Sequence, residues 1–337
     1  MAETVLVTGG SGFIAGWCIV ELLRRGYGVR TTVRNLAKAP AVRAAIAAEV
    51  DPGDRLTFFA AELTSPEGWD AAVAGCDYVL HVASPLGTGA VRHPDELIVP
   101  AREGALNVLR AAAAAGVKRV VLTSSVAAVG GMGTDEVRDE TQWTDLSTRG
   151  LDAYRQSKTI AERAAWDFVA AEDKGMELVT VLPSVVIGPV LSPEGLGSVQ
   201  VISRLVGGKI PGTPRIGFTL VDVRDVADLH LRAMTAPEAP GERFIAATEF
   251  KWFAEIAAIL RARLGERAAK VPTRRLPDFV PRLMALFDPA LRYVVPGLGR
   301  RNSWSSAKAK RVLGWAPRPV EDSIAECGES LVAKGAA

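Results

Sequence analysis

Residues 8–15 read TGGSGFIA and lie between a short β-branched run at 4–7 and an apolar stretch at 12–25. Glycine at such a strand-to-helix junction lets the backbone turn tightly and approach a phosphate, because it carries no Cβ. The first N–H groups of a helix lack partners within the helix, and its dipole favours an anion there. The stretch therefore predicts a dinucleotide-binding turn with the pyrophosphate near Gly9 and Gly12, the alternative being a purely structural turn.

Outward from this turn, short apolar runs alternate with longer runs rich in Ala and Leu as far as Pro183. The short runs predict buried parallel strands, and the longer runs predict helices. The predicted strands are 4–7, 28–33, 56–60, 78–82, 119–123 and 178–182, and the predicted helices are 12–25, 41–49, 96–115 and 153–171. This alternation predicts an α/β fold with a doubly wound parallel sheet of the Rossmann type.

The regular alternation ends after Pro183, where Gly and Pro crowd residues 188–217. We expect residues 220–234 and 242–246 to rejoin the main sheet. The tail from about residue 250 combines predicted short helices with many prolines. We therefore expect two units. The first is a dinucleotide-binding Rossmann domain of residues 1–187 plus about 218–249. The second is a smaller, mostly C-terminal substrate lobe of about 188–217 plus 250–337.

The composition excludes several functional classes. The 337 residues include 40 Lys and Arg against 38 Asp and Glu, a net charge of +2, which argues against binding to nucleic acid or to an acidic membrane. Three widely spaced cysteines predict neither a disulfide framework nor a zinc site and fit a reducing compartment. No apolar run reaches about 18 residues, and no basic segment precedes an N-terminal apolar run. We expect a cytoplasmic protein without a membrane span, secretion signal or bound metal.

The end of the second predicted strand indicates which dinucleotide binds. Sites for NAD usually carry an acidic residue about 20 positions beyond the last glycine of the turn. Residues 31–34 read TTVR instead, so Arg34 stands at the strand end, and Lys38 follows one helical turn later. A guanidinium and an ammonium are suitable donors to a phosphate, so the sequence favours NADP. The alternative is that both are solvated surface cations.

A candidate catalytic motif lies at residues 154–158, which read YRQSK. Its spacing places Tyr154 and Lys158 on one face of a helix. A phenol has a pKa of about 10, and a nearby ammonium lowers it by stabilising the phenolate. Ser124 and Ser125 end the fifth predicted strand, at the edge of the sheet where such folds bind ligands. A serine there would hold a carbonyl oxygen while Tyr154 donates a proton to it.

Five segments together resemble an extended short-chain dehydrogenase/reductase: TGGSGFIA, HVASP (81–85), LTSSVAAVG (122–130), YRQSK and LPSVVIGP (182–189). The VRN at 33–35, HVASP and DVRDVAD (222–228) are similar to the branch of dihydroflavonol 4-reductases and fungal carbonyl (aldehyde) reductases. The resemblance covers about residues 1–250. It implies a ketoreductase that uses NADPH to reduce a ketone or aldehyde reversibly to an alcohol, with Ser125, Tyr154 and Lys158 as the catalytic triad. Tyr154 would be the proton donor, and Lys158 would hold the nicotinamide ribose and tune Tyr154.

The resemblance also implies the cofactor contacts. They are Gly9, Gly12, Phe13 and Ile14 at the pyrophosphate, Arg34 and Lys38 at the 2′-phosphate, Glu62 and Leu63 near adenine, Val82, Ala83 and Ser84 along the dinucleotide, Tyr154 and Lys158 at the ribose, Pro183 and Val186 beside the nicotinamide, and Ser198 from the smaller lobe. Glu62 stands where an Asp is more usual. Asn107 lies where some relatives carry a proton-relay or helix-stabilising Asn. Trp143, Phe218 and segment 279–287 either wall the substrate pocket or belong to the core.

Two other functions share parts of this pattern. An NAD(P)-dependent nucleotide-sugar epimerase or dehydratase has the same loop, Ser, Tyr and Lys, but the 188–217 segment has few cations for a diphosphate. A non-catalytic dinucleotide sensor usually lacks the Tyr or the Lys, and both are present here. We expect a small-molecule carbonyl substrate and either a monomer or a homodimer paired through the helices at 96–115 and 153–171.

Overall fold

The computed structural model describes residues 2–85, 91, 93–130, 135–172, 175–286 and 295–337. In these residues, the central sheet has seven parallel strands in the order β10-β7-β5-β4-β1-β2-β3. The strands are β1 (Thr4–Val7), β2 (Gly28–Val33), β3 (Leu56–Ala60), β4 (Tyr78–His81), β5 (Arg119–Thr123), β7 (Glu177–Pro183) and β10 (Arg243–Ala246). The strand order reverses between β1 and β4, so ligands are expected at the carboxyl ends of these two strands.

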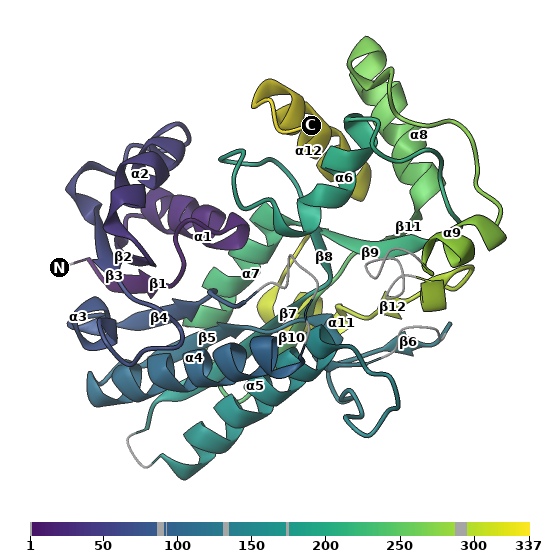
Figure 1. The fold of residues 1–337 in the computed structure, drawn as a ribbon. Coiled ribbons are helices and arrows are strands. Elements are labelled where there is room, and N and C mark those ends of the chain that lie inside the picture. The colour runs from purple at the N-terminus through teal and green to yellow at the C-terminus, as the bar shows by residue number, and fades with distance from the viewer. Residues whose placement is uncertain (1, 86–90, 92, 131–134, 173–174, 287–294) are drawn as a thin grey trace.

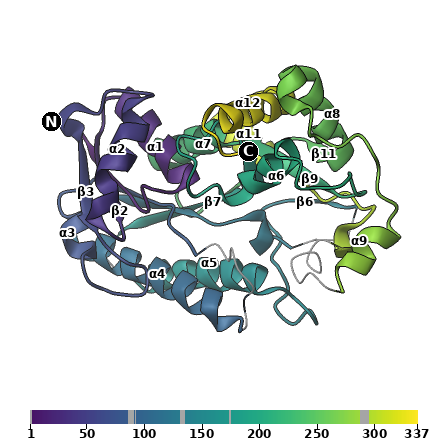
Figure 2. The same cartoon turned by 45° about the horizontal axis from the view of Figure 1, so that its top comes forward.

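Helices cover both faces of this sheet, and Figure 2 shows α4 and α5 on one face and α1 and α7 on the other. Their bounds are α1 (Phe13–Arg24), α4 (Asp95–Ala114), α5 (Ala153–Ala171) and α7 (Val223–Thr235), with the shorter α2 (Ala39–Ala47) and α3 (Trp69–Val73) near the β3 edge. Because both faces are covered, the inner strands are buried along most of their length, and β5 is buried at every residue. The predicted doubly wound α/β fold is confirmed.

Most predicted elements have the expected bounds. Strands at 4–7, 28–33, 56–60 and 119–123 and the helix at 153–171 are observed as predicted, and the helices at 12–25, 41–49 and 96–115 differ by one or two residues at their ends. Of the predicted return of residues 220–234 and 242–246 to the main sheet, the second segment is confirmed as β10, whereas the strand in the first segment is not part of that sheet. The open edge of β7 accepts one strand, and β10 occupies it with Arg243 opposite Thr180.

The strand that precedes α7, β9 (Gly217–Asp222), lies instead in a smaller sheet. Within the described part of the chain, this sheet has three strands, with β9 between β8 (Val185–Ile187) and β11 (Phe250–Trp252). β8 follows β7 after Ser184 and pairs with β9 in parallel, whereas β11 pairs with β9 antiparallel. The chain therefore leaves the main sheet at Pro183 and builds a second sheet from short strands that the sequence pattern did not reveal.

A separate hydrophobic core forms where helices pack on this smaller sheet, at the upper right of Figure 1. It joins Ile187 and Leu220 of the sheet to Ile202, Leu260 and Ile324 of the helices. The helices are α6 (Gln200–Val206), α8 (Phe253–Leu264) and α12 (Val320–Ala333). The chain also forms α9 (Phe279–Met284) and a two-stranded sheet of β6 (Val137–Arg138) and β12 (Ser303–Trp304), whereas α11 (Ala307–Leu313) packs into the core of the main sheet through Ala309 and Leu313. The residue bounds predicted for the two lobes stay a prediction.

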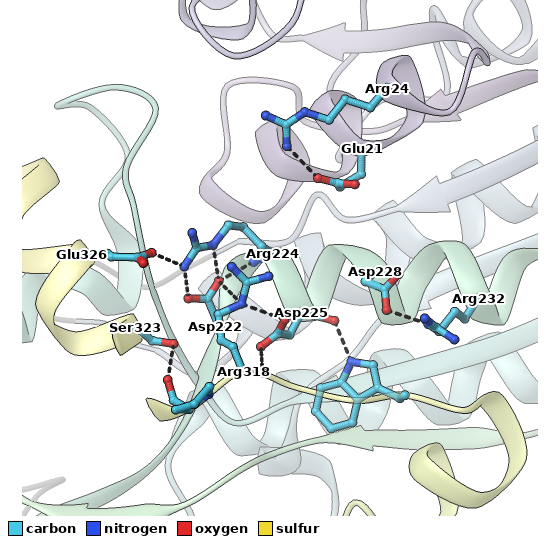
Figure 3. A network of polar contacts seen from close by, with 12 residues as sticks. Glu21, Arg24, Asp222, Arg224, Asp225, Asp228, Arg232, Arg318, Ser323 and Glu326 are labelled. Atoms are coloured by element: carbon cyan, nitrogen blue, oxygen red, sulfur yellow. Dashed lines mark hydrogen bonds and ion pairs between the residues drawn. The ribbon is translucent and has the colours of Figure 1, made fainter. Parts of the chain in front are cut away.

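A polar network anchors the N-terminus of α7 to α12 and to the segment before it. Figure 3 shows Arg224 between Asp222 and Glu326. Asp222 caps α7, because its carboxylate accepts the Arg224 N–H at 2.8 Å, and Asp225 accepts the Arg318 backbone and side-chain N–H groups, each at 2.9 Å. The DVRDVAD segment is therefore explained by packing and capping in this structure.

All three cysteines are free and buried. Burial raises the pKa of the Cys76 thiol to about 11 and that of Cys327 to about 12, and it raises the pKa of Cys18 further. Across the described ranges, no group of three or more His, Cys, Asp or Glu side chains is arranged to hold a metal ion. No helix in the same ranges combines the length and the apolar character needed to cross a bilayer.

Candidate active site

The glycine turn after β1 forms an open cradle at the N-terminus of α1. Gly12 is the N-cap residue, no side chain caps the helix, and no acidic residue stands in its first turn. Gly9 has a φ of +73°, and a Cβ built on it would lie 3.0 Å from the Ala83 Cβ. A Cβ on Gly10 would overlap Thr31, a packing requirement that sequence reasoning missed. The uncapped N–H groups and the space kept free of side chains fit a dinucleotide pyrophosphate.

Thr8 joins the ends of β1 and β4 beside this cradle. Its hydroxyl oxygen accepts the backbone N–H groups of Val82 at 3.0 Å and Ala83 at 2.9 Å. Its hydroxyl proton is therefore donated to His81 Nδ1, 2.9 Å away. Burial, followed by the charge of Lys158, lowers the pKa of His81 to about 3. His81 is thus a neutral, packed residue, and Thr8 fixes the segment that holds Val82, Ala83 and Ser84.

The cations proposed for the 2′-phosphate lie at the end of β2. Arg34 follows the last residue of β2, Lys38 ends a short 3₁₀ turn, and both are exposed. Lys38 Nζ lies 3.4 Å from Glu194 Oε2 across the glycine turn. The loop that carries Glu194 approaches this turn closely, since a Cβ on Gly195 would lie 3.3 Å from the Ser11 carbonyl. This exposed pair can open toward a phosphate at little cost.

The residues expected near adenine follow β3. Glu62 is exposed, and Leu63 packs against Gly104 of α4, where a Cβ would come within 2.7 Å of the Leu63 side chain. Asn107 Nδ2 donates to the Leu63 carbonyl at 3.0 Å. Asn107 therefore fixes the loop after β3 to α4, which favours the structural role among those considered for it.

Ser125, Tyr154 and Lys158 meet where β5 ends against the first turns of α5. Ser125 is the N-cap of a 3₁₀ turn, and its Oγ accepts the Ala127 N–H at 3.1 Å. Burial raises the pKa of Tyr154, and its hydrogen bond with Ser125 acts in the opposite direction. Lys158 is buried one turn further along α5, and its Nζ donates to the Thr123 carbonyl at 3.3 Å. Burial lowers the pKa of Lys158 to about 8, while the charge of Glu162 opposes this change.

The strand end that holds Lys158 is itself fixed by His230. The Val226 carbonyl, 2.8 Å from His230 Nδ1, can only accept, so Nδ1 carries the proton. His230 Nε2 therefore accepts the hydroxyl proton of Thr123 at 2.7 Å. Burial lowers the pKa of His230 to about 4, so this arrangement persists at neutral pH.

The side chains of Ser124 and Ser125 have different hydrogen-bond partners. Ser124 Oγ donates to Glu162 Oε2 at 2.6 Å inside the protein, whereas Ser125 bonds to Tyr154. Glu162 is a buried residue that sequence reasoning missed, although Tyr154, Lys158 and Glu162 follow one another at four-residue spacing on α5. That spacing was a usable signal.

The other predicted contacts lie around the start of the smaller sheet. Pro183 ends β7, Val186 is buried in β8, and Ser198 Oγ donates to the Val186 carbonyl at 2.6 Å. Two proposed wall residues pack against other side chains. The Trp143 ring lies 3.7 Å from the Arg243 guanidinium, and Phe218 packs on Phe253.

Segment 279–287 is described only as far as Leu286, so Phe287 lies outside the described residues. Phe279, Leu283 and Leu286 are exposed, at 66%, 56% and 63%. They give the protein an apolar surface in its C-terminal third.

Known proteins resemble this chain over most of its length. The model of the NAD dependent epimerase/dehydratase family matches residues 5–247. Cinnamoyl-CoA reductase CAD2 of Medicago truncatula is 38% identical over 348 residues, which cover 99% of this chain and 97% of that protein. An anthocyanidin reductase ((2S)-flavan-3-ol-forming) of Vitis vinifera is 35% identical over 300 residues, covering 83% and 86%.

A solved structure of yeast methylglyoxal/isovaleraldehyde reductase Gre2, complexed with NADPH, shares the fold. It has a TM-score of 0.81 and 24% identity and covers 99% of this chain and 100% of that chain. The resemblance predicted from the five motifs is confirmed by the family match and by the reductase relatives. The chain therefore belongs to the NAD dependent epimerase/dehydratase family.

Proposed function

We propose that this protein is an NADPH-dependent carbonyl reductase that converts a ketone or aldehyde reversibly to an alcohol. The observation that carries the proposal is the meeting of Ser125, Tyr154 and Lys158 at the carboxyl edge of β5, beside the uncapped N-terminus of α1. The names of the relatives at 38% and 35% identity, which are reductases, support the same class of reaction.

The residues have separate tasks in this reaction. NADPH, when bound, supplies the hydride to the carbonyl carbon. Ser125 donates a hydrogen bond to the carbonyl oxygen, and Tyr154 transfers its phenolic proton to that oxygen as it gains negative charge. Lys158, held by the Thr123 carbonyl, stabilises the phenolate that remains on Tyr154. Reprotonation of Tyr154 from solvent returns the site to its starting state.

The test follows the cofactor through a turnover. With an aryl or alkyl ketone, we expect one NADPH oxidised for each alcohol formed, and with a UDP-sugar we expect no consumption. A diphosphate needs paired cations when it is desolvated, and the 188–217 segment has few of them. Absorbance of NADPH and chromatography of the product give the ratio. Sugar interconversion without net NADPH use would favour the epimerase alternative.

A second test concerns the choice of NADPH over NADH. Replacing Arg34 by Ala should lower the affinity for NADPH by about 10–150-fold, because a hydrogen bond to a charged group contributes about 1.5–3 kcal/mol. NADH has no 2′-phosphate, so its kcat/KM should change little. The matched control is Arg267→Ala, which removes another exposed arginine, one paired with Glu329. Equal losses for both cofactors, or a wild-type preference for NADH, would contradict the assignment.

A further inference from the structure

Glu162 is a fully buried carboxylate one helical turn beyond Lys158. Its side chain is 0% exposed and accepts Arg243 Nε at 2.8 Å and Nη2 at 3.3 Å. Its oxygens also accept the hydroxyls of Ser124 at 2.6 Å and Thr180 at 2.9 Å. A carboxylate with these donors is held in a fixed orientation.

A small cavity of about 20 Å³ connects Glu162 to Lys158. His81, Ser84 and Ser124 also contribute to its lining, and Ala101 and Ala105 of α4 are apolar members of the wall. This volume is enough for one water molecule, which needs two to four polar partners to be stable. The lining supplies that number, so the cavity suits a single ordered water.

Among the described residues, Lys158 keeps N–H donors of its ammonium available for such a water. Its ammonium has three donors, and one of them reaches the Thr123 carbonyl. A water in the cavity would accept a second and donate onward to Glu162 or Ser124. It would thereby join the two charged side chains that line the same cavity.

Among the described residues around Lys158, Glu162 is the group that supplies negative charge, as the neighbouring elements show. His81 on β4 is neutral, and Arg243 on β10 is cationic. Glu140 lies behind Arg243, where its carboxylate accepts the Ile245 N–H at 2.9 Å, and it does not line the cavity. Asp152, at the N-terminus of α5, pairs with Arg155. Toward the cavity, α4 presents alanines, and β7 presents Thr180 to Glu162.

We propose that Glu162 is a positioning residue for Lys158: its buried charge, acting through one water in the cavity, holds the Lys158 side chain as an ammonium one helical turn from Tyr154. The role rests on the proposed reductase function, since it matters only if Tyr154 transfers a proton. Glu162 itself touches neither the substrate nor the cofactor.

The decisive variant is Glu162→Gln, which keeps the shape and hydrogen-bonding oxygen but removes the charge. Lys158 then loses its proton at a lower pH, and Tyr154 loses its ammonium partner there. In the pH profile of carbonyl reduction, kcat falls above a certain pH, the alkaline limit. This limit should therefore shift to lower pH in the variant, by about one pH unit. Glu140→Gln is the matched control. It makes the same substitution at a buried carboxylate beside Arg243, outside the cavity, and should retain the wild-type limit.

An unchanged alkaline limit in Glu162→Gln, with only a uniform loss of kcat, would overturn the proposal and leave Glu162 a structural residue. If this variant fails to fold, a high-resolution crystal structure of the wild-type protein decides instead. A water within hydrogen-bond distance of both Lys158 Nζ and an oxygen of Glu162 or Ser124 supports the role, and a dry cavity overturns it. A wild-type protein that reduces no carbonyl compound would refute the proposed function separately.

Discussion

Tyr154→Phe is expected to lower kcat for carbonyl reduction by about 10²–10⁴-fold, the usual contribution of a positioned general acid. The substitution removes the phenolic proton and leaves the ring, which is partly buried at the start of α5, in place. The fold and the affinity for NADPH should therefore change little. Steady-state rates and a fluorescence titration with NADPH measure the two quantities separately.

The control for this variant is Tyr78→Phe, which removes a hydroxyl 3.5 Å from Glu3 at the start of β4. The amino ends of the parallel strands lie at the opposite edge from the site, so kcat should stay close to the wild-type value. If Tyr154→Phe retained more than about a tenth of the wild-type rate, another proton donor would have to act in the reaction.

Arg243→Met should produce the largest loss of stability, about 3–5 kcal/mol in the free energy of unfolding. The substitution leaves Glu162 charged, buried and without its ion partner. It also removes the donors to the Glu140 carbonyl at 2.6 Å and the Gln142 carbonyl at 2.9 Å. Denaturant titration followed by circular dichroism measures the change.

The matched control is Arg263→Met, which breaks a surface ion pair with Asp322 at 2.8 Å, with the two side chains 52% and 44% exposed. Solvent screens such pairs, so this loss should stay below about 1 kcal/mol. Similar losses in the free energy of unfolding for the two variants would show that Glu162 can remain buried without an ion partner, contrary to the expected cost of desolvating an unpaired charge.

The central sheet was predictable because its signals are local. Each strand is a short run of four to seven residues with several apolar or β-branched members, because the inner strands are covered on both faces. The smaller sheet was not predictable in the same way. β8 has three residues, and its pairing with β9 depends on β10 occupying the edge of β7, a contact between distant parts of the chain.

In the candidate site too, local features could be predicted, and features that depend on distant contacts could not. The glycine turn and the Tyr154–Lys158 spacing are local patterns, and the structure places them at one edge of the sheet with Ser125. Glu162 was missed because an acidic residue on a helix usually faces water. Its burial depends on Arg243, which is 81 residues away in sequence. Thr8 was missed because its role requires β4 to lie beside β1.

The three buried thiols make the natural chain a suitable background for site-specific labelling. Maleimides react with the thiolate, and burial both shields Cys18, Cys76 and Cys327 and keeps them protonated. A cysteine introduced at an exposed position, such as Leu283 on α9, would be the single reactive thiol of the folded protein. A dye attached there would report on the apolar surface of α9 without prior removal of any native cysteine.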